Sequence, residues 1–402
     1  MATTLPDDLI EKSGGRIVLI VMDGLGGLPD PATGLTELET AATPNLDRIA
    51  RRAALGLHQP AGAGITPGSG PGHLALFGYD PIAWNIGRGV LSALGVGFDL
   101  KHGDIATRLN FASVDAQGNI TDRRAGRPSD EENKRLVKKL QEQVKSLGGV
   151  QVFFAPEKEH RLVLVLRGRA LRAELADTDP QETGVPPLAV RATDDAAAET
   201  AQIVQRVLDS ANQVLAGEPQ ANAVLARGFA EYGRYPSFVE RFGLRAHAAA
   251  RYPMYLGVAR LVGMETAPIA ASDDALLQTL EKSYDQYDFH FIHFKATDSR
   301  GEDGDFAAKA KAIEAVDALL PRVEALKPDV LVITGDHSTP SNMRAHSWHP
   351  VPILIASQFA RGSDAKGFGE RDCLRGELGV FPAVQIMTLA LAHAGRLAKF
   401  GA

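Results

Sequence analysis

The sequence contains a single cysteine, Cys373, among 402 residues. One thiol excludes an intramolecular disulfide framework and a thiolate-rich metal site, so any bound metal must use oxygen and imidazole ligands. Long apolar runs are lacking too, because none approaches the roughly 20 residues needed to span a bilayer. Runs such as Ile17–Met22 have only the length of a buried strand. We therefore expect a protein of a reducing compartment without a membrane-spanning helix.

A large excess of charge is also missing. The formal net charge of −6 and the pI near 6.0 give no electrostatic reason to expect nucleic acid or an anionic membrane as a partner. The segment Met1–Lys12 contains Asp7, Asp8 and Glu11, and it lacks the basic start and apolar stretch of a secretory signal. These absences predict a cytoplasmic protein, and any anionic small molecule must be held by a local cluster of basic residues.

Three apolar runs share one design. Each predicts a buried parallel strand that is followed at its carboxyl end by polar, metal-competent residues. The runs are Ile17–Met22 before Asp23, Phe289–Phe294 before Asp298, and Val330–Ile333 before Asp336 and His337. Ligands bind at that edge in open α/β sheets. We predict an α/β core domain with a mostly parallel sheet flanked by helices, formed by residues 1–100 and 243–402.

The middle of the chain has a different pattern. The expected strands Gln151–Phe154 and Arg161–Leu166 lie among long amphipathic helices, one of which begins at a capping box made by Ser129 and Glu132. Residues that look like one site lie on both sides of this segment. We therefore predict that residues 101–242 form an α+β cap domain inserted into the core.

A loop of small and turn-forming residues surrounds Ser69. Its sequence, Thr66–His73, is Thr-Pro-Gly-Ser-Gly-Pro-Gly-His. Such a loop exposes the hydroxyl and lets a bulky anion approach the backbone, although an ordinary turn has the same composition. A serine hydroxyl is a weak nucleophile at neutral pH unless a base or a metal stabilises its alkoxide. The interpretation of Ser69 as a nucleophile thus depends on metal ligands nearby.

Candidate ligands are abundant after the predicted strands. Asp336 and His337 place a carboxylate and an imidazole side by side, and His346 and His349 follow shortly after. The acidic, glycine-containing stretch Asp298–Asp305 offers further oxygen ligands, with a solvated acidic loop as the alternative. With Asp23, these groups predict two neighbouring metal centres of the kind that serve phosphoryl transfer.

The other histidines receive no chemical role. His290 and His293 lie in one expected strand at odd spacing, which sends them to opposite faces and indicates structural positions. No assignment is made for His58, His102, His247 or His393.

A basic cluster in the expected cap is the candidate binding site for an anionic substrate. Its residues are Arg123, Arg124, Arg127, His160 and Arg161, with Arg88, Arg108 and Arg227 as weaker candidates of the same type. Guanidinium groups bind phosphate and carboxylate in bidentate fashion, which suits a small acid that carries both groups. A solvated surface is the alternative.

In combination, these residues resemble the alkaline phosphatase superfamily and, more narrowly, the cofactor-independent phosphoglycerate mutases of the archaeal type. The resemblance covers nearly the whole chain. Its motifs are Val21-Met22-Asp23-Gly24, Ser69-x-x-Gly72-His73, Asp80-Pro81, Asn110-Phe111-Ala112, Asp122–Arg127, Asp177-Thr178-Asp179-Pro180, Gly263-Met264 and Gly335-Asp336-His337. It implies one metal bound by Asp23, Ser69, Asp336 and His337, and a second bound by Asp298, Glu302 and His346.

The chain departs from the family pattern at the second centre. Glu302 stands where histidine is usual, and an oxygen ligand favours Mn²⁺ or Mg²⁺ over Zn²⁺. His349 stands where an acidic residue is common, so it is the other candidate to replace the missing imidazole. Leu256 replaces a basic residue of many relatives, which would remove one anion contact.

The resemblance implies an isomerase of glycolysis and gluconeogenesis that interconverts 3-phosphoglycerate and 2-phosphoglycerate. Ser69 would carry the phosphoryl group as phosphoserine while cap arginines hold the carboxylate of glycerate, without 2,3-bisphosphoglycerate. A metal-dependent phosphatase and a phosphomutase for another small phosphorylated acid are the alternatives. A non-catalytic binding protein is a further one, although a pure binding site needs no nucleophile.

Overall fold

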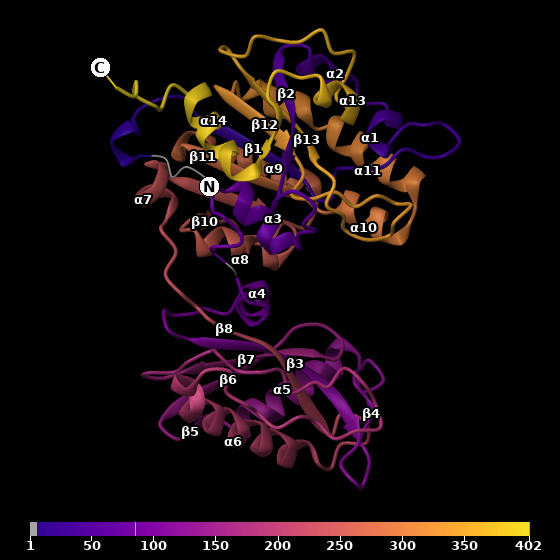
Figure 1. Ribbon diagram of the computed structural model, residues 1–402, viewed down its shortest axis with the longest axis vertical. Helices are drawn as coiled ribbons and strands as arrows, with labels where there is room; N and C mark the ends of the chain where they lie inside the picture. Colours follow the sequence, from indigo (N-terminus) through magenta and orange to yellow (C-terminus); the bar gives the residue numbers. More distant parts are fainter. Residues whose placement is uncertain (1–5, 85, 402) are drawn as a thin grey trace. The chain divides into compact units, whose positions relative to one another are not determined.

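A computed structural model describes residues 6–84 and 86–401. Residues 1–5 of the N-terminal segment considered above lie outside the described residues. The chain forms two compact units, the larger from Met1–Asn85 and Pro236–Ala402 and the smaller from Ile86–Tyr235, so the smaller is an insertion in the larger (Figure 1). Within the described ranges, no helix combines the length and the apolar character needed to cross a bilayer.

The larger unit is built on one sheet with the strand order β10–β9–β11–β1–β12–β13–β2–β14. The strands are β1 (Ile17–Met22), β2 (Ala53–Gln59), β9 (Ala246–Ala250), β10 (Glu265–Thr266), β11 (Phe289–Phe294), β12 (Val330–Thr334), β13 (Val351–Ser357) and β14 (Gly379–Pro382). Among the described strands of this sheet, β13 alone runs antiparallel to its neighbours, β12 and β2, and the other pairs are parallel. The predicted mostly parallel sheet is confirmed.

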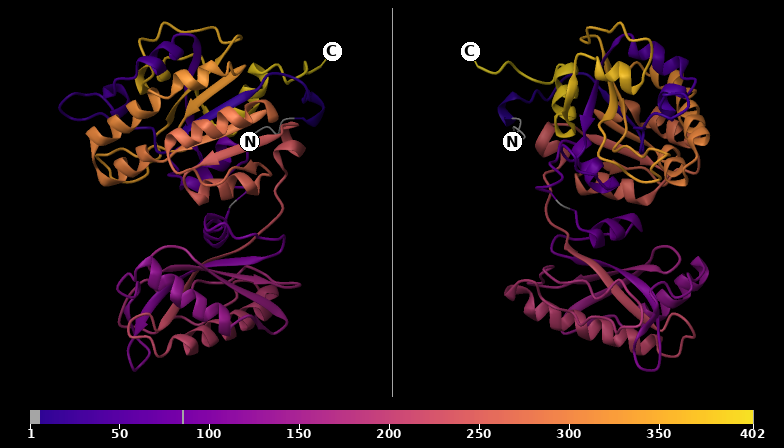
Figure 2. Two further views of the ribbon diagram at one scale, coloured as in Figure 1. Left: turned by 180° about the vertical axis from the view of Figure 1, so that it is seen from behind. Right: turned by 45° about the vertical axis from the view of Figure 1, so that its right-hand side comes forward.

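Helices cover both faces of this sheet (Figures 1 and 2). They are η1 (Asp7–Leu9), α1 (Glu37–Thr40), α2 (Pro44–Ala50), α3 (Ser69–Leu76), α7 (Phe238–Phe242), α8 (Pro253–Leu261), α9 (Asp273–Ser283), η3 (Tyr284–Gln286), α10 (Ala296–Asp303), α11 (Phe306–Asp317), α12 (Leu320–Ala325), α13 (Glu370–Leu374), η4 (Ala383–Gln385) and α14 (Ile386–His393). Apolar residues of α1, α2, α9, α11 and α12 share one core cluster with alternate residues of β1. The opposite face receives α3 and α8, which contact each other.

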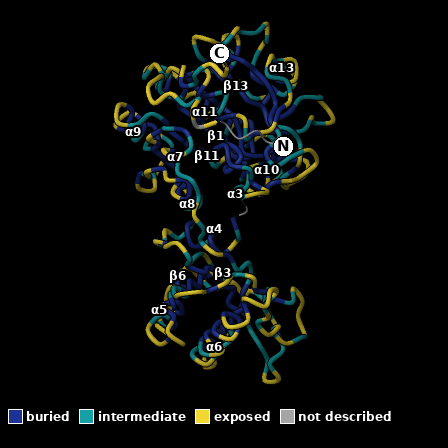
Figure 3. Tube along the Cα trace, turned by 60° about the vertical axis from the view of Figure 1, so that its left-hand side comes forward, coloured by how far each residue is buried: buried dark blue, intermediate teal, exposed yellow. Residues whose placement is uncertain are grey.

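The central strand β1 is buried along its whole length, as are β11 and β12 (Figure 3). A strand that is covered on both faces requires an unbroken apolar run, which is the pattern that predicted it. In the parallel register, Ile17 lies opposite Phe289 on one side and Val330 on the other. The segments that follow the three strands therefore reach the same edge of the sheet.

The smaller unit is an α+β layer structure. Its strands are β3 (Ile105–Val114), β4 (Ile120–Asp122), β5 (Ser146–Leu147), β6 (Val150–Pro156), β7 (Arg161–Arg167) and β8 (Ala223–Glu231), and its helices are α4 (Arg88–Gly95), α5 (Asp130–Gln143), η2 (Asp195–Ala197) and α6 (Ala198–Leu215). The order is β4–β3–β7–β6–β5, with β8 also paired to β3. Figure 2 shows α5 and α6 on one face of this sheet, where their apolar residues form a single core cluster with it.

The unit boundaries differ from those expected at 101 and 242. The smaller unit starts at Ile86 because α4 packs closely on its sheet: a Cβ at Gly89 would lie 2.0 Å from the carbonyl oxygen of Ala106. It ends at Tyr235 because α7 belongs to the larger unit, where the ring of Phe238 lies 5.0 Å from that of Phe289. The expected boundaries missed both contacts, which are tertiary.

Candidate active site

The edge of the large sheet collects the predicted metal ligands. Asp23 follows β1 directly, Asp336 and His337 follow β12, and Asp298 lies in the first turn of α10. All four residues are fully buried. Ser69 is the first residue of α3, after the N-cap residue Gly68.

His337 lies at the centre of the first group. Its Nε2 atom is 3.3 Å from Asp23 Oδ1 and 3.2 Å from Asp336 Oδ2. The hydroxyl of Ser69 lies 3.4 Å from the same nitrogen. Four residues from three distant parts of the sequence are thus within reach of one another.

A second group shares His337 with the first. His346 Nε2 lies 3.5 Å from Asp298 Oδ1, and His337 Nδ1 lies 3.9 Å from that oxygen. The two imidazole rings are stacked with their centroids 3.7 Å apart. In each of the groups Asp23–Asp336–His337 and Asp298–His337–His346, the three potential ligand atoms lie within 4.8 Å of one another.

Glu302 and His349 differ in their distance from these groups. Glu302 Oε1 is 3.8 Å from His346 Nε2, and the Glu302 side chain is 54% exposed. His349 Nδ1 instead lies 3.0 Å from Ser347 Oγ, and its ring stacks on Trp348. Of the two candidates for the unusual ligand position, Glu302 is the one beside His346.

The donor set fits divalent cations. Asp23 Oδ1 and Asp336 Oδ2 are buried without a hydrogen-bond partner among the described residues. Buried carboxylate oxygens are costly unless hydrogen bonds or a cation compensate for their lost hydration. Carboxylate and imidazole ligands suit Mn²⁺, Mg²⁺ and Zn²⁺.

The local field keeps the carboxylates ionised. Burial by itself raises the pKa of Asp23, but the neighbouring imidazole groups of His293 and His337 outweigh it and hold that pKa well below its usual value. Burial also lowers the pKa of His337, yet the charges of Asp336 and Asp23 reverse this effect and raise the pKa to about 9. The protein therefore gathers negative charge at this edge and balances it with imidazole protons.

Two histidines support the ligands although the sequence analysis gave them no role. The Nε2 atom of His293, which was expected to be structural, lies 3.0 Å from Asp23 Oδ2. His73, on the same helix as Ser69, has its Nδ1 atom 2.8 Å from the Ser69 carbonyl oxygen and 3.1 Å from Asp336 Oδ2. The position of His73 one helical turn after Ser69 was the signal that could have identified it.

Lys295 and Thr339 were also missed. The ammonium group of Lys295 donates to Asp23 Oδ2 at 3.2 Å and to a carboxylate oxygen of Asp298. The hydroxyl of Thr339 donates to Asp298 Oδ1 at 2.6 Å and lies 3.0 Å from His337 Nδ1. Lys295 directly follows β11, so the rule that identified Asp23 after β1 applies to it as well.

The basic residues of the smaller unit fall into two classes. Arg123 forms a bidentate ion pair with buried Asp179, with distances of 2.8 Å from Nε and 2.7 Å from Nη2. Its guanidinium group is therefore already engaged. Arg124, Arg127 and Arg161 are exposed.

His160 is buried next to these arginines. Its Nδ1 atom forms no hydrogen bond with any described residue. Burial, together with the charges of Arg161 and Arg124, lowers the pKa of His160 to about 4. The imidazole is thus neutral at neutral pH and offers one uncharged polar group among guanidinium groups.

Arg108 joins the cluster on the sheet of the smaller unit. In the antiparallel ladders, Arg108 lies opposite Arg227 of β8, and Asn110 lies opposite Arg161 of β7. Directly opposed residues share one face, so these side chains project from the same side of the sheet. Arg108 Nε is buried and has no hydrogen-bond partner in the described ranges. The sequence analysis ranked Arg108 below Arg123 as a candidate to bind an anionic substrate. In the structure, the guanidinium group of Arg123 is already paired with Asp179, whereas the Nε atom of Arg108 is not paired with any described residue.

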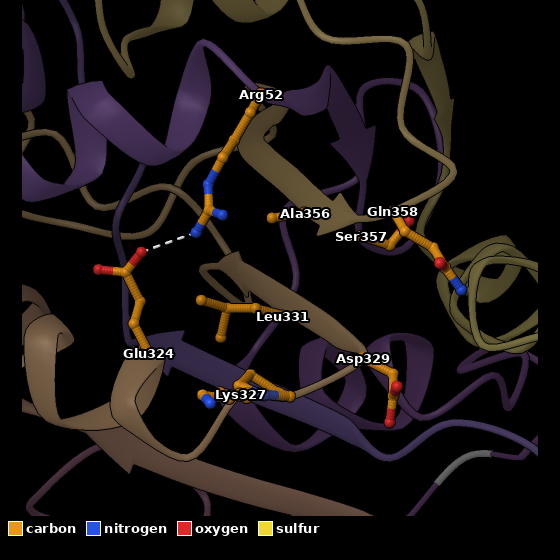
Figure 4. A pocket seen from close by; sticks show the side chains of 9 residues that line it. Arg52, Glu324, Lys327, Asp329, Leu331, Ala356, Ser357 and Gln358 are labelled. Atoms are coloured by element: carbon orange, nitrogen blue, oxygen red, sulfur yellow. Dashed lines mark hydrogen bonds and ion pairs between the residues drawn. The ribbon is translucent and has the colours of Figure 1, made fainter.

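A separate pocket of about 450 Å³ lies at the amino end of β12, lined in part by Asp329 and Leu331 (Figure 4). Two of its charged side chains, Arg52 and Glu324, form an ion pair of 2.7 Å across it. We assign this pocket no role in the chemistry, because the metal-competent groups lie after the carboxyl ends of the strands.

Comparison with known proteins identifies relatives of this chain. The family model described as 2,3-bisphosphoglycerate-independent phosphoglycerate mutase matches residues 50–221. A protein of Thermus thermophilus named "probable 2,3-bisphosphoglycerate-independent phosphoglycerate mutase" is 50% identical over 398 residues, which cover 98% of both chains. A protein of Aquifex aeolicus with the same name is 50% identical over 403 residues, covering 98% of this chain and 99% of its own.

Solved structures show the same fold. A protein from Pyrococcus horikoshii has a TM-score of 0.82 and 31% identity, and the match covers 97% of this chain and all of that one. The cofactor-independent phosphoglycerate mutase from Thermoplasma acidophilum has a TM-score of 0.77 and 28% identity, with 95% of this chain and all of that one covered. The chain belongs to the 2,3-bisphosphoglycerate-independent phosphoglycerate mutase family.

Proposed function

We propose that the protein interconverts 3-phosphoglycerate and 2-phosphoglycerate, with Ser69 as the nucleophile. The observation that carries the proposal is the position of the Ser69 hydroxyl, 3.4 Å from His337 Nε2 and next to buried carboxylates with unpartnered oxygens. A site for ligand binding alone has no use for a hydroxyl held at such a cluster.

Two divalent ions would be held by Asp23, Ser69, Asp336 and His337 on one side, and by Asp298, Glu302 and His346 on the other. When bound, such ions lower the charge repulsion around the phosphoryl group and favour the ionised form of the serine oxygen. Mn²⁺ and Mg²⁺ suit the oxygen-rich set that includes Glu302, with Zn²⁺ as the alternative.

The proposed reaction consists of two in-line displacements. In the first, Ser69 Oγ forms a bond to phosphorus while the bond from phosphorus to the C3 oxygen of the substrate breaks, which leaves phosphoserine and glycerate. In the second, the C2 hydroxyl oxygen of glycerate attacks phosphorus, and the bond to Ser69 Oγ breaks. In each step the attacking hydroxyl loses one proton and the leaving oxygen gains one, so the protons balance and the isomerisation needs no other reactant.

Residues of this chain have defined tasks in the scheme. His73 and Gly72 fix the start of α3 against Asp336, which holds the Ser69 hydroxyl in place. Lys295 offers an ammonium group at the same cluster, suited to a phosphate oxygen. Exclusion of water is required throughout, because hydrolysis of phosphoserine would release phosphate.

The carboxylate of the substrate requires a separate basic group. We assign it to basic residues of the smaller unit: Arg108, whose buried Nε atom has no hydrogen-bond partner among the described residues, and the exposed Arg124, Arg127 and Arg161 near His160. Arg123 is given a structural task instead, because its guanidinium group is paired with Asp179.

The test is conversion of 3- to 2-phosphoglycerate by the Ser69→Ala variant in the presence of Mn²⁺ and without 2,3-bisphosphoglycerate, with free phosphate measured in parallel. We expect turnover to be lost. Ser210→Ala, on helix α6 of the smaller unit, is the matched control, because the Ser210 hydroxyl donates to the Arg206 carbonyl oxygen of its own helix. Undiminished turnover in Ser69→Ala would refute the assignment, and stoichiometric phosphate release by the wild type would favour a phosphatase.

A further inference from the structure

Lys309, on α11, is a fully buried lysine outside the ligand set. Burial lowers the pKa of its ammonium group, and the carboxylates of Glu37 and Glu370 oppose this effect. A buried ammonium group is retained only where it is well compensated, because its desolvation is costly. The question is what this group accomplishes in the fold.

Its two hydrogen bonds connect the loops that carry the ligands. Lys309 Nζ donates to the carbonyl oxygen of Gly26 at 3.0 Å and to that of Thr339 at 2.8 Å. Gly26 lies three residues after Asp23, and Thr339 lies two residues after His337. One ammonium group thus bridges the loop after β1 and the loop after β12, in addition to the backbone hydrogen bond that the Thr339 N–H donates to the Gly26 carbonyl oxygen at 3.0 Å.

The joined loops meet a third ligand-bearing segment at the same point. The Thr339 hydroxyl donates to Asp298 Oδ1 at 2.6 Å. A Cβ at Gly301 would lie 2.3 Å from the Thr339 carbonyl oxygen, so α10 is pressed against the carbonyl group that Lys309 binds. The position of that carbonyl group therefore influences both the Asp298 side and the His337 side of the cluster.

Glu37 provides the counter-charge. Its Oε1 atom lies 3.9 Å from Lys309 Nζ and accepts hydrogen bonds from the backbone N–H and the hydroxyl of Ser341 at 2.8 and 2.6 Å. Ser341 lies two residues after Thr339. Lys309 and Glu37 therefore both hold the loop after β12, Lys309 through Thr339 and Glu37 through Ser341.

We propose that Lys309 is a positioning residue: by joining the carbonyl oxygens of Gly26 and Thr339, it sets the spacing between Asp23 and the Asp336–His337 pair and so maintains affinity for divalent metal. This inference rests on the proposed function for the identity of the ligands. Lys309 does not touch the substrate or the reacting atoms. Residues that orient metal ligands typically contribute about 10- to 100-fold to metal affinity or activity.

The experiment measures Mn²⁺ binding to the metal-free full-length protein by electron paramagnetic resonance, together with kcat and KM. Lys309→Met removes the charge and both hydrogen bonds, and Lys311→Met is the matched control, because Lys311 is an exposed residue of the same helix that pairs with Glu314. We expect Lys309→Met to raise the Kd for Mn²⁺ by about 10-fold or more and to lower kcat with little change in KM. Lys311→Met should match the wild type.

The double variant Lys309→Met/Glu37→Gln separates positioning from stability. It removes the charge of Lys309 together with that of its ion-pair partner Glu37, so the folded state recovers, while the bridge that the ammonium group makes between the carbonyl groups of Gly26 and Thr339 stays broken. We expect Mn²⁺ affinity to remain reduced in this well-folded protein. Affinity within about 2-fold of the wild type would overturn the proposal, and so would such affinity in Lys309→Met itself.

Failure of the proposed function gives a different result. Mn²⁺ binding is measured without substrate, so a wild type that binds Mn²⁺ but lacks mutase turnover would overturn the reaction while the positioning role is still judged from the variants. A wild type that does not bind Mn²⁺ would overturn the metal centres and the positioning role together.

Discussion

Gly72 lies at a close contact between α3, which carries Ser69, and the loop that carries Asp336. A Cβ at Gly72 would lie 2.5 Å from the Asp336 carbonyl oxygen and 3.2 Å from its carbonyl carbon. These are backbone atoms, which cannot rotate away as the end of a flexible side chain can. The substitution Gly72→Ala therefore forces the helix and the loop apart.

The size of the displacement follows from this geometry. Ordinary van der Waals contact begins at 3.4 Å, so the gap must widen by about 0.9 Å. In the wild type the Ser69 hydroxyl lies 3.4 Å from His337 Nε2. In the variant Ser69 moves with the helix, away from His337. A misplacement of about 1 Å in a reacting group can cost about 100-fold in rate, and overpacking of this kind costs about 1–3 kcal/mol of stability.

The assay compares kcat for the mutase reaction and urea unfolding of Gly72→Ala with those of Gly217→Ala. Gly217 lies outside α3 in the smaller unit, with no atom within 4 Å of its Cβ position, so alanine there should leave both quantities nearly unchanged. Turnover of Gly72→Ala within about 3-fold of the wild type would refute the claim that this contact sets the Ser69 position.

Further predictions concern the metal site and the basic residues of the smaller unit. Because the metal binds only the folded site, Mn²⁺ at about 100 times its Kd should stabilise the chelator-treated protein by about 2.7 kcal/mol in thermal or urea unfolding. Glu302→Ala should lower the amount of metal bound per chain, as measured by elemental analysis. An unchanged metal content would exclude Glu302 as a ligand. Arg123→Met should destabilise the protein by about 1–3 kcal/mol, since buried Asp179 loses its bidentate partner. Arg124→Met, at an exposed position, should raise KM and leave the free energy of urea unfolding within about 0.5 kcal/mol of the wild type. Equal stability of the two variants would contradict this division of roles.

The three central strands could be predicted from the sequence because a strand buried on both faces requires an uninterrupted apolar run. The run Ile17–Met22 coincides with β1, and Phe289–Phe294 coincides with β11. The candidate ligands Asp23 and Asp336 were identified by the same local rule, since polar residues that directly follow such strands lie at the ligand-binding edge.

Other features of the site were not predictable in this way. His293 lies within an apolar strand, and only the pairing of β1 with β11 places it beside Asp23. Arg123 and Arg108 are the same residue type, yet Arg123 forms an ion pair with Asp179, whereas the Nε atom of Arg108 is buried without a hydrogen-bond partner among the described residues. No local pattern records such a difference, because it depends on which side chain another segment brings near.

The sequence by itself determined the three central strands of the large sheet and the residue types that follow them, since burial pattern and turn chemistry are local properties. The tertiary structure alone decided the unit boundaries, the contact of Gly72 with Asp336, and the link that Lys309 makes between two loops. Each of these is a contact between segments far apart along the chain, and its distance is set by the packing of the whole unit.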